Sequence, residues 1–301
     1  MSKLIVTAFI LLFLSSACNA IFPTYEGYYA KDSDNLFVAQ HVLSLSEPLK
    51  NDSMLGLLFG YSMYNDSIRS ESSQLYQLKY SNKVYDRWAF SAQGGSLQYL
   101  NKSMPVFSGN AVYTSPDGFR MEATVDKAIV DTIICFDNDV SVVTSFVSAD
   151  IPVYKWFVAI LGADARSFSD RNERTGLLLK SVFILPVDGL SLQAWHRQFR
   201  DTNINTIGYF NPETINFQRY IIAYRRGLFN GIRMSIKTGP GFQQVNNDDR
   251  TETFYFESGL GKNIEAGLSF TVNYIYTDSF IDNNLLSYKI NIVVCNFAYT
   301  F

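Results

Sequence analysis

Apolar and polar residues alternate with a period of two along most of the chain, as in strands that have one apolar and one polar face. The clearest stretch runs from Ile264 to Thr277, where apolar side chains occupy nearly every second position. A second such row is formed by Leu55, Leu57, Phe59, Tyr61 and Met63. After residue 20 the longest unbroken apolar stretch is Trp156–Ala163, which is far shorter than the roughly 18 residues of a membrane-spanning helix. The pattern predicts an all-β chain.

The apparent strands are long enough to cross a bilayer, which needs about 9–11 residues per tilted strand. Long and short connections alternate in the second half, with turns at 186–189, 227–230 and 261–263 between longer loops at 167–173, 201–214, 245–249 and 278–284. Outer-membrane barrels have this asymmetry and an even strand number. We therefore predict a transmembrane antiparallel β-barrel of about 16 strands, at 36–45, 55–64, 75–81, 84–93, 95–101, 106–115, 118–128, 139–149, 154–166, 174–185, 190–200, 215–226, 231–244, 250–260, 264–277 and 285–301.

The first residues have the pattern of a secretory signal peptide. Lys3 precedes the apolar run Leu4–Leu14, and small residues follow up to Ala20. Cleavage after Ala20, cleavage after Ala17 and lipidation at Cys18 remain open as alternatives. The predicted organisation is a signal peptide at 1–20, a short periplasmic N-terminal segment at 21–35 and the barrel at 36–301.

The segment 122–139 departs from the period of two. Val125, Ile129 and Ile133 recur at a spacing of four residues, with charged residues off that face. This spacing favours a short helix inside or at the rim of the barrel, and the alternative is two strand ends joined by a loop.

The chain ends in alternating aromatic residues, with Phe297, Tyr299 and the terminal Phe301 on one face of the last predicted strand. This ending resembles the signal that the barrel assembly machinery recognises in outer-membrane barrels. We therefore expect that machinery and outer-membrane lipid to be partners of this chain, and the bacterial outer membrane to be its location.

Composition limits the chemistry. The chain of 301 residues has 47% hydrophobic, 15% aromatic and 18% charged residues, with a net charge of −3, so it lacks the cation excess of a nucleic-acid-binding protein. Only His41 and His196 are available as general bases, and neither stands in a His-x-Ser pattern. No spacing suits a transition metal. We expect no enzymatic activity, no catalytic residue, no metal and no cofactor.

If the apolar rows face lipid, the alternate residues face the lumen, which is polar in channel barrels. The candidate pore-lining residues are Arg219, Arg225, Arg233, Lys237, Glu265 and Asn273. Aromatic residues near strand ends, such as Tyr274 and Tyr276, suit the interfacial girdles of a barrel. The alternative use of aromatic residues, stacking on sugar rings in the lumen, stays open.

Three stretches resemble the C-terminal barrel of exopolysaccharide export proteins, namely the outer-membrane component of cellulose-synthase operons and the poly-N-acetylglucosamine export porins. They are the polar loop Arg166–Arg174, the motif of Gly208, Tyr209, Phe210, Asn211 and Pro212 followed by Glu213, and the closing strand that ends at Phe301. The resemblance covers roughly Asp131–Phe301. It implies a sixteen-stranded barrel that passes a growing polysaccharide and catalyses no reaction.

In that family the barrel follows a long array of tetratricopeptide repeats, and the sequence contains no such helical repeat of about 34 residues. We therefore expect any periplasmic scaffold to be a separate protein. The predicted function is passive export of an exopolysaccharide through an outer-membrane pore, with the 201–214 loop shaping its outer mouth. The alternatives are a general diffusion porin for small solutes and a non-conducting structural or adhesin-like barrel.

Overall fold

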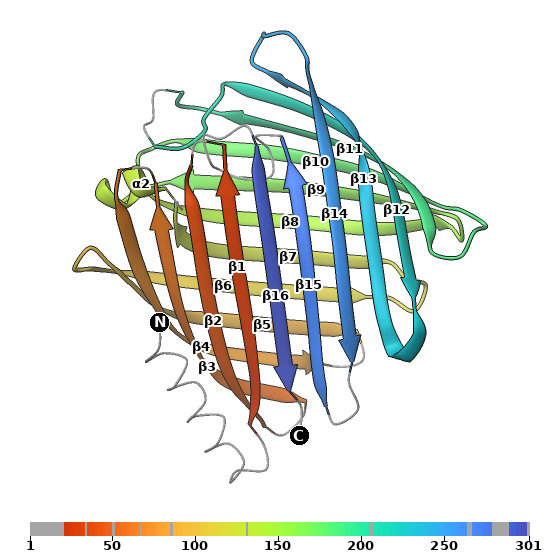
Figure 1. Ribbon diagram of the computed structural model, residues 1–301, viewed down its shortest axis with the longest axis horizontal. Helices are drawn as coiled ribbons and strands as arrows, with labels where there is room; N and C mark the ends of the chain where they lie inside the picture. The colour runs from red at the N-terminus through yellow and green to blue at the C-terminus, as the bar shows by residue number, and fades with distance from the viewer. Residues whose placement is uncertain are drawn as a thin grey trace.

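The computed structural model describes residues 21–299 except 34, 50–51, 67, 85–86, 131, 205–207, 264–266 and 279–288. Sixteen strands form one closed antiparallel barrel, in which each strand pairs with its neighbours in sequence and β16 pairs with β1 (Figure 1). This confirms the predicted fold class. The strands are β1 (Phe22–Asp32), β2 (Phe37–Pro48), β3 (Ser53–Asn65), β4 (Ser70–Val84), β5 (Trp88–Tyr99), β6 (Lys102–Thr114), β7 (Arg120–Ile129), β8 (Ser141–Tyr154), β9 (Phe157–Phe168), β10 (Glu173–Ile184), β11 (Leu190–Asp201), β12 (Thr214–Gly227), β13 (Ile232–Val245), β14 (Thr251–Asn263), β15 (Leu268–Thr277) and β16 (Ile290–Tyr299).

The first strand lies where the sequence predicted a periplasmic segment at 21–35, so that prediction was wrong. β1 pairs with β16 on one side and β2 on the other, from Thr24 opposite Ala298 to Asp32 opposite Ile290. Its pattern is blurred because aromatic residues occupy both faces, with Tyr25 and Tyr29 on one and Tyr28 on the other. The barrel therefore begins at residue 22 rather than 36, and the expected signal peptide at 1–20 lies outside the described residues.

The prediction was also wrong in dividing β5 into two strands. The predicted strands at 84–93 and 95–101 both fall largely on one strand, β5, and Gly94 and Gly95 at their junction lie in its middle. A Cβ at Gly95 would lie 1.8 Å from the backbone oxygen of Tyr76 on β4, so the glycine permits a close approach between strands rather than a turn. One missed strand and one false division cancel, which is why the predicted number of sixteen is nevertheless correct.

The two ends of the barrel differ. β1 begins and β16 ends at the same end, here called the proximal end, and the connections there span 2 to 5 residues between strands, as at 155–156 and 185–189. The opposite, distal end has the long connections 130–140 and 202–213. Because outer-membrane barrels have short periplasmic turns and longer outer loops, the distal end is the one expected to face outward.

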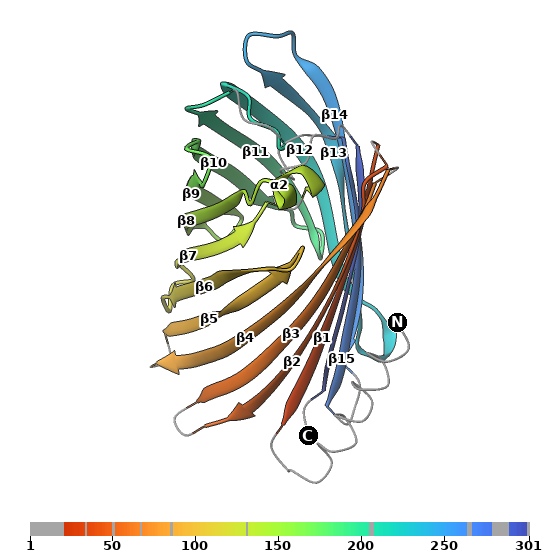
Figure 2. The same cartoon turned by 90° about the vertical axis from the view of Figure 1, so that its left-hand side faces the viewer.

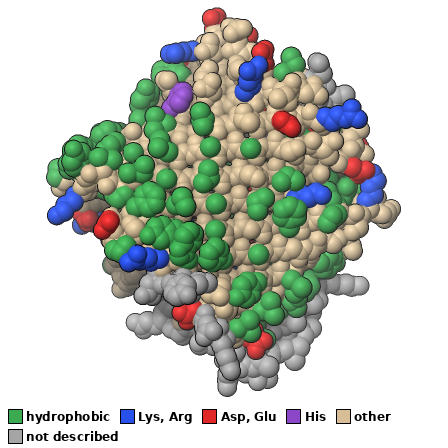
Figure 3. Space-filling view, turned by 180° about the vertical axis from the view of Figure 1, so that it is seen from behind, with side chains coloured by type: hydrophobic (Ala, Val, Ile, Leu, Met, Phe, Trp, Pro, Cys, Tyr) green, Lys and Arg blue, Asp and Glu red, His purple; other side chains and the backbone are tan. Residues whose placement is uncertain are grey.

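Apolar side chains cover much of the outside of the barrel, and most of the charged side chains in the same view lie toward its edges (Figure 3). The predicted row on β3 is part of this surface, with Leu55, Leu57 and Phe59 all exposed. Aromatic rings gather near the proximal end, where Trp88 stacks on Phe90 and Trp156 stacks on Tyr154. An apolar band edged by aromatic rings is the surface that lipid requires.

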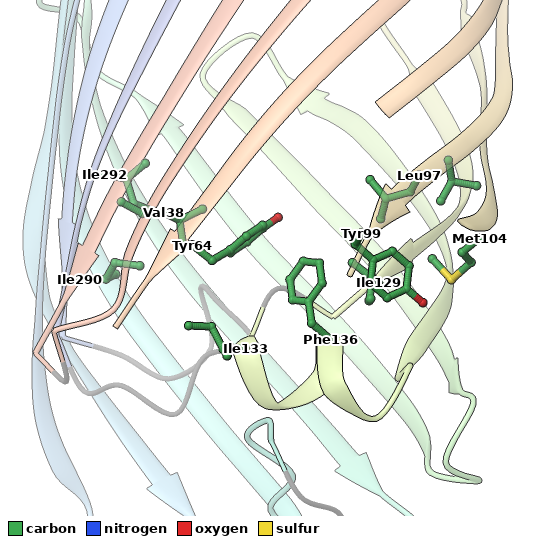
Figure 4. Close-up of a cluster of buried hydrophobic side chains, with 12 residues drawn as sticks. Val38, Tyr64, Leu97, Tyr99, Met104, Ile129, Ile133, Phe136, Ile290 and Ile292 are labelled. Atoms are coloured by element: carbon green, nitrogen blue, oxygen red, sulfur yellow. The ribbon is translucent and has the colours of Figure 1, made fainter. Parts of the chain in front are cut away.

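The connection between β7 and β8 enters the barrel and forms the helix α2 (Ile133–Asp137), at the distal end (Figure 2). Phe136 of α2 contacts Tyr64 and Tyr99, with ring centroids 4.6 Å and 5.5 Å away (Figure 4). A short 3-10 helix, η1 (Phe229–Gly231), forms the turn before β13. Within the described residues, no helix combines the length and apolarity needed to span a membrane.

The segment 122–139 therefore combines both of its predicted forms. A helix is present, as one alternative proposed, but it is only five residues long and follows the end of β7. Ile133 is buried in the cluster around α2, whereas Val125 belongs to β7 and is exposed. The residues at this four-residue spacing therefore belong partly to a strand and partly to a helix, and they do not form one face of a single helix.

The outward position of Leu78 yields a stability prediction. Leu78 lies near the middle of β4 and is 60% exposed, so Leu78→Lys puts a charge into the lipid and should destabilise the barrel by about 2–4 kcal/mol. Urea unfolding in lipid vesicles measures the change. Asn110→Lys is the matched control because Asn110 faces the lumen and donates to Glu122 at 2.8 Å. Equal destabilisation by both substitutions would contradict the assignment of faces.

Candidate functional site

Two segments that are distant in sequence meet inside the distal end and form what we call the distal latch, defined as α2 together with residues 208–212. Tyr209 is only 1% exposed and stacks on Phe168 at the end of β9, with centroids 4.5 Å apart and ring planes 9° apart. Its hydroxyl donates to Asp170 at 2.9 Å and accepts from the Asn172 side chain at 3.2 Å. The loop therefore turns inward, and the Tyr209 ring of the motif predicted at the outer mouth is buried in the lumen.

Thr132 joins the two parts of the latch. Its hydroxyl donates to the backbone oxygen of Gly208 at 2.7 Å and accepts from the backbone nitrogen of Cys135 at 3.2 Å, so it also caps α2. Gly208 has a φ of +102°, and a Cβ there would lie 3.0 Å from the sulfur of Cys135. Glycine is favoured here because the positive φ strains any other residue and because an added Cβ would force the side chains of Cys135 and Ile134 to shift.

A buried ion pair holds the base of the same loop. The Arg174 guanidinium on β10 binds both carboxylate oxygens of Asp201 on β11 at 2.9 Å, and the two side chains are 3% and 0% exposed. Arg174 also donates to the backbone oxygen of Phe210, and Asn172 donates to Asp201 at 3.0 Å. Removing one partner of such a pair leaves a buried charge, at a cost of about 3–5 kcal/mol.

The exit from α2 is held by a more exposed contact. Lys102 at the start of β6 donates to both carboxylate oxygens of Asp139, at 2.8 Å and 2.9 Å. This hydrogen bond to Lys102 lowers the pKa of Asp139. A lowered pKa means that the contact stabilises the latch at neutral pH and is lost as the pH falls through that value.

Below the latch, a cavity of about 280 Å³ opens in the lumenal wall. It combines three aromatic rings with two cations, and its lining comes from five neighbouring strands. Lys180 lies over the ring of Trp195, with its nitrogen 4.3 Å from the ring centroid. The lining residues are Phe146, Ser148, Ile160, Leu178, Lys180, Trp195, Arg197 and Phe217.

The predicted pore-lining residues lie on lumen-facing positions wherever the structure describes them. Arg219 is fully buried, with its guanidinium carbon 4.2 Å from the centroid of Tyr255 and one nitrogen 3.2 Å from the Thr277 hydroxyl. Lys237 forms an ion pair with Glu257 at 2.9 Å. Both cations are therefore held by the wall, which limits their availability to a solute.

Arg225, Arg233 and Asn273 share the lumenal face by strand alternation, because each is an even number of residues from an inward neighbour. Arg225 and Arg233 lie near the proximal rim and are exposed. Glu265 lies outside the described residues, as does Phe301. Phe297 is exposed on the outer face of β16, and Tyr299 follows at the same face by alternation.

The sequence placed Arg174 only at the end of the polar loop 166–174, and it did not single out Asp201, Lys180 or Phe146. Lys180 could not be assigned to the lumenal face from the sequence, because residues 177–185 carry apolar side chains on both faces. In the structure Arg174, Leu178 and Lys180, which are separated by even numbers of residues, lie on the same, inward face of β10. In the sequence Trp195 and Arg197 were noted only as the neighbours of His196. Side chains alternate along β11, so Trp195 and Arg197 face the lumen and His196 faces outward. No sequence signal places Asp201 opposite Arg174. Among the described residues, no three His, Cys, Asp or Glu side chains gather as a metal site.

Comparisons with known proteins agree with the fold. No protein-family model matches the chain, and no curated protein sequence matches it. A solved structure described as a bacterial polysaccharide outer membrane secretin aligns with a TM-score of 0.74 at 11% identity, over 94% of this chain and 99% of that chain. CdiB from Acinetobacter baumannii aligns with a TM-score of 0.52 at 10% identity, over 93% and 60% of the two chains. At such identities the likeness establishes the fold, that of bacterial outer-membrane barrels.

The buried sulfur of Cys135 reports on the latch. In a Cys18→Ser, Cys295→Ser background Cys135 is the only thiol, because the chain has three cysteines. Gly208→Ala should force residue 208 away from α2 at a cost of about 1–3 kcal/mol, so we expect maleimide labelling of Cys135 in the folded barrel to rise about tenfold.

Gly118→Ala is the matched control. Gly118 also has a positive φ but lies in the turn between β6 and β7, where an added Cβ would meet nothing closer than 3.8 Å. A labelling rate for Gly208→Ala no higher than that of this control would show that residue 208 does not hold α2 in place.

Proposed function

We propose that this barrel is a passive pore in the bacterial outer membrane through which a polysaccharide is exported. The observation that carries the proposal is the placement of Trp195, Phe146 and Phe217 around an open cavity in the lumen. Aromatic rings in a transmembrane barrel normally face lipid or the interfaces. Rings that face an aqueous lumen instead offer flat apolar surfaces to the C–H faces of sugar rings.

The strand number supports a pore. Barrels of about 16–18 strands are too wide for the side chains of their own wall to fill and commonly leave an aqueous channel. The distal latch then acts as the constriction, which a chain emerging at the outer end must pass. The resemblance of Arg166–Arg174 and of residues 208–213 to exopolysaccharide export proteins supports the same function. A separate periplasmic protein would supply the scaffold, and the barrel itself would catalyse no reaction.

A second candidate rests on a specific observation. The buried cluster around Ile133 and Phe136 occupies the distal end of the lumen and makes the latch resemble a packed core (Figure 4). If the latch never opens, the protein is a non-conducting structural barrel. A general diffusion porin is the remaining alternative, and it predicts conduction without any effect of saccharides.

Planar-bilayer recordings distinguish these functions. We expect the purified protein to conduct weakly and neutral oligosaccharides to reduce the current. Replacement of residues 203–212 by a two-residue turn should raise the conductance, because it removes Tyr209 and the acceptor for Thr132 from the lumen.

The same replacement at 246–250, a distal loop outside the latch, is the control and should leave the conductance unchanged. Equal currents from all three proteins would contradict a constricting role for the latch. No current from any of them would favour the structural barrel, and an open current insensitive to saccharides would favour the diffusion porin.

A further inference from the structure

Charges on the inside of the barrel are divided between its walls. β10, β11, β12 and β13 present seven lumen-facing cations and one carboxylate, that of Asp201. The strands on the opposite side of the closed barrel, β2, β3, β4 and β5, present one lumen-facing cation, Lys79, and one carboxylate, Glu71, among the side chains that the structure describes. The seven cations are Arg174, Lys180, Arg197, Arg219, Arg225, Arg233 and Lys237.

Most of the cations deep in this wall already have protein partners. Arg174 binds Asp201, Lys237 binds Glu257, and Arg197 lies 3.3 Å from a carboxylate oxygen of Asp164. These pairs fix the wall and leave little free positive charge on it.

Lys180 is different. Its nitrogen faces the ring of Trp195 inside the cavity, and in the described part of the chain no carboxylate forms an ion pair with it. At longer range Lys237 repels Lys180, whereas Asp150 and Glu257 attract it; Asp150 lies beside Arg120, and Glu257 binds Lys237. The ammonium group thus retains its capacity to bind an anion.

Two further cations lie between the proximal opening of the barrel and Lys180. Arg225 and Arg233 lie exposed near the proximal rim, on strands of the same wall, and neither forms an ion pair with a described carboxylate. An anionic chain entering from the proximal end would meet these two cations first and the cavity afterwards. Lumenal charge of one sign concentrates and selects solutes of the opposite sign.

We infer that the cavity around Lys180 and Trp195 is a binding subsite for one carboxylate-bearing sugar unit, and that Arg225 and Arg233 on the same wall guide an anionic polysaccharide to it. The inference rests on the proposed function. The volume of about 280 Å³ is slightly below the roughly 300–1,000 Å³ typical of small-molecule sites, which suits a single sugar ring. The sugar ring packs on the indole of Trp195, and the carboxylate of the sugar accepts a charge-assisted hydrogen bond from Lys180.

Trp195 provides a direct reporter of binding. The chain has three tryptophans, and Trp88 and Trp156 belong to the outer aromatic surface. In a Trp88→Phe, Trp156→Phe barrel, the remaining fluorescence reports on the cavity whether or not current flows. Three hexasaccharides serve as probes: oligogalacturonate is anionic, maltohexaose is neutral, and the glucosamine hexamer is cationic.

We expect oligogalacturonate to change the fluorescence at a concentration about tenfold lower than maltohexaose, the size of one charge-assisted hydrogen bond. Lys180→Met should remove most of this preference while keeping a flexible side chain on Trp195. Lys79→Met is the matched control, because Lys79 faces the lumen from β4 by strand alternation and lies outside the cavity; it should leave the preference unchanged.

Four results would overturn the subsite. The neutral hexamer could bind as tightly as the anionic one, the cationic hexamer could bind more tightly, Lys79→Met could reduce the preference as much as Lys180→Met, or no probe could change the fluorescence. Bilayer currents from the same preparations test the proposed function separately. Current without saccharide binding overturns the subsite and leaves a pore, whereas anion-dependent fluorescence without current supports the subsite and contradicts the pore.

Discussion

The pairing of β1 with β16 is the constraint on which the rest of this structure depends. Lipid cannot hydrogen-bond a strand edge, so a sheet in a bilayer is stable only when its last strand returns to its first. Closure fixes the register of every strand and, with it, the face that each side chain occupies. The apolar outer band, the lumenal charges and the distal latch all follow from that one closed ladder.

Closure also creates the need for the latch. A wall of sixteen strands encloses more space than its own side chains fill, so apolar residues at the distal end require partners from elsewhere in the chain. α2 supplies Phe136 to Tyr64 and Tyr99, and the loop before β12 supplies Tyr209 to Phe168. The polar network around Arg174 and Asp201 ties these inserted segments to the wall, where an unpaired charge would be costly.

The lumen therefore contains two regions with different physical properties. The distal region is packed and largely apolar, so it resists the passage of a solute. The region below it keeps an open cavity in which an ammonium group faces an aromatic ring. Under the proposed function, an exported chain would be bound weakly in the second region and hindered in the first, a combination that suits slow, selective passage more than rapid diffusion.

The fold class and the outward row of β3 could be predicted because alternation is a local property, readable wherever one face is apolar and the other polar. β1 was missed because Tyr25, Tyr28 and Tyr29 make both of its faces aromatic, and β5 was divided at Gly94 because two consecutive glycines, Gly94 and Gly95, resemble a turn. The sequence by itself determined a long-stranded barrel with a polar lumen. Only the tertiary structure decided that Tyr209 is buried, that Asp201 neutralises Arg174 and that Lys180 faces an open cavity, because those outcomes depend on residues that only register and closure bring together.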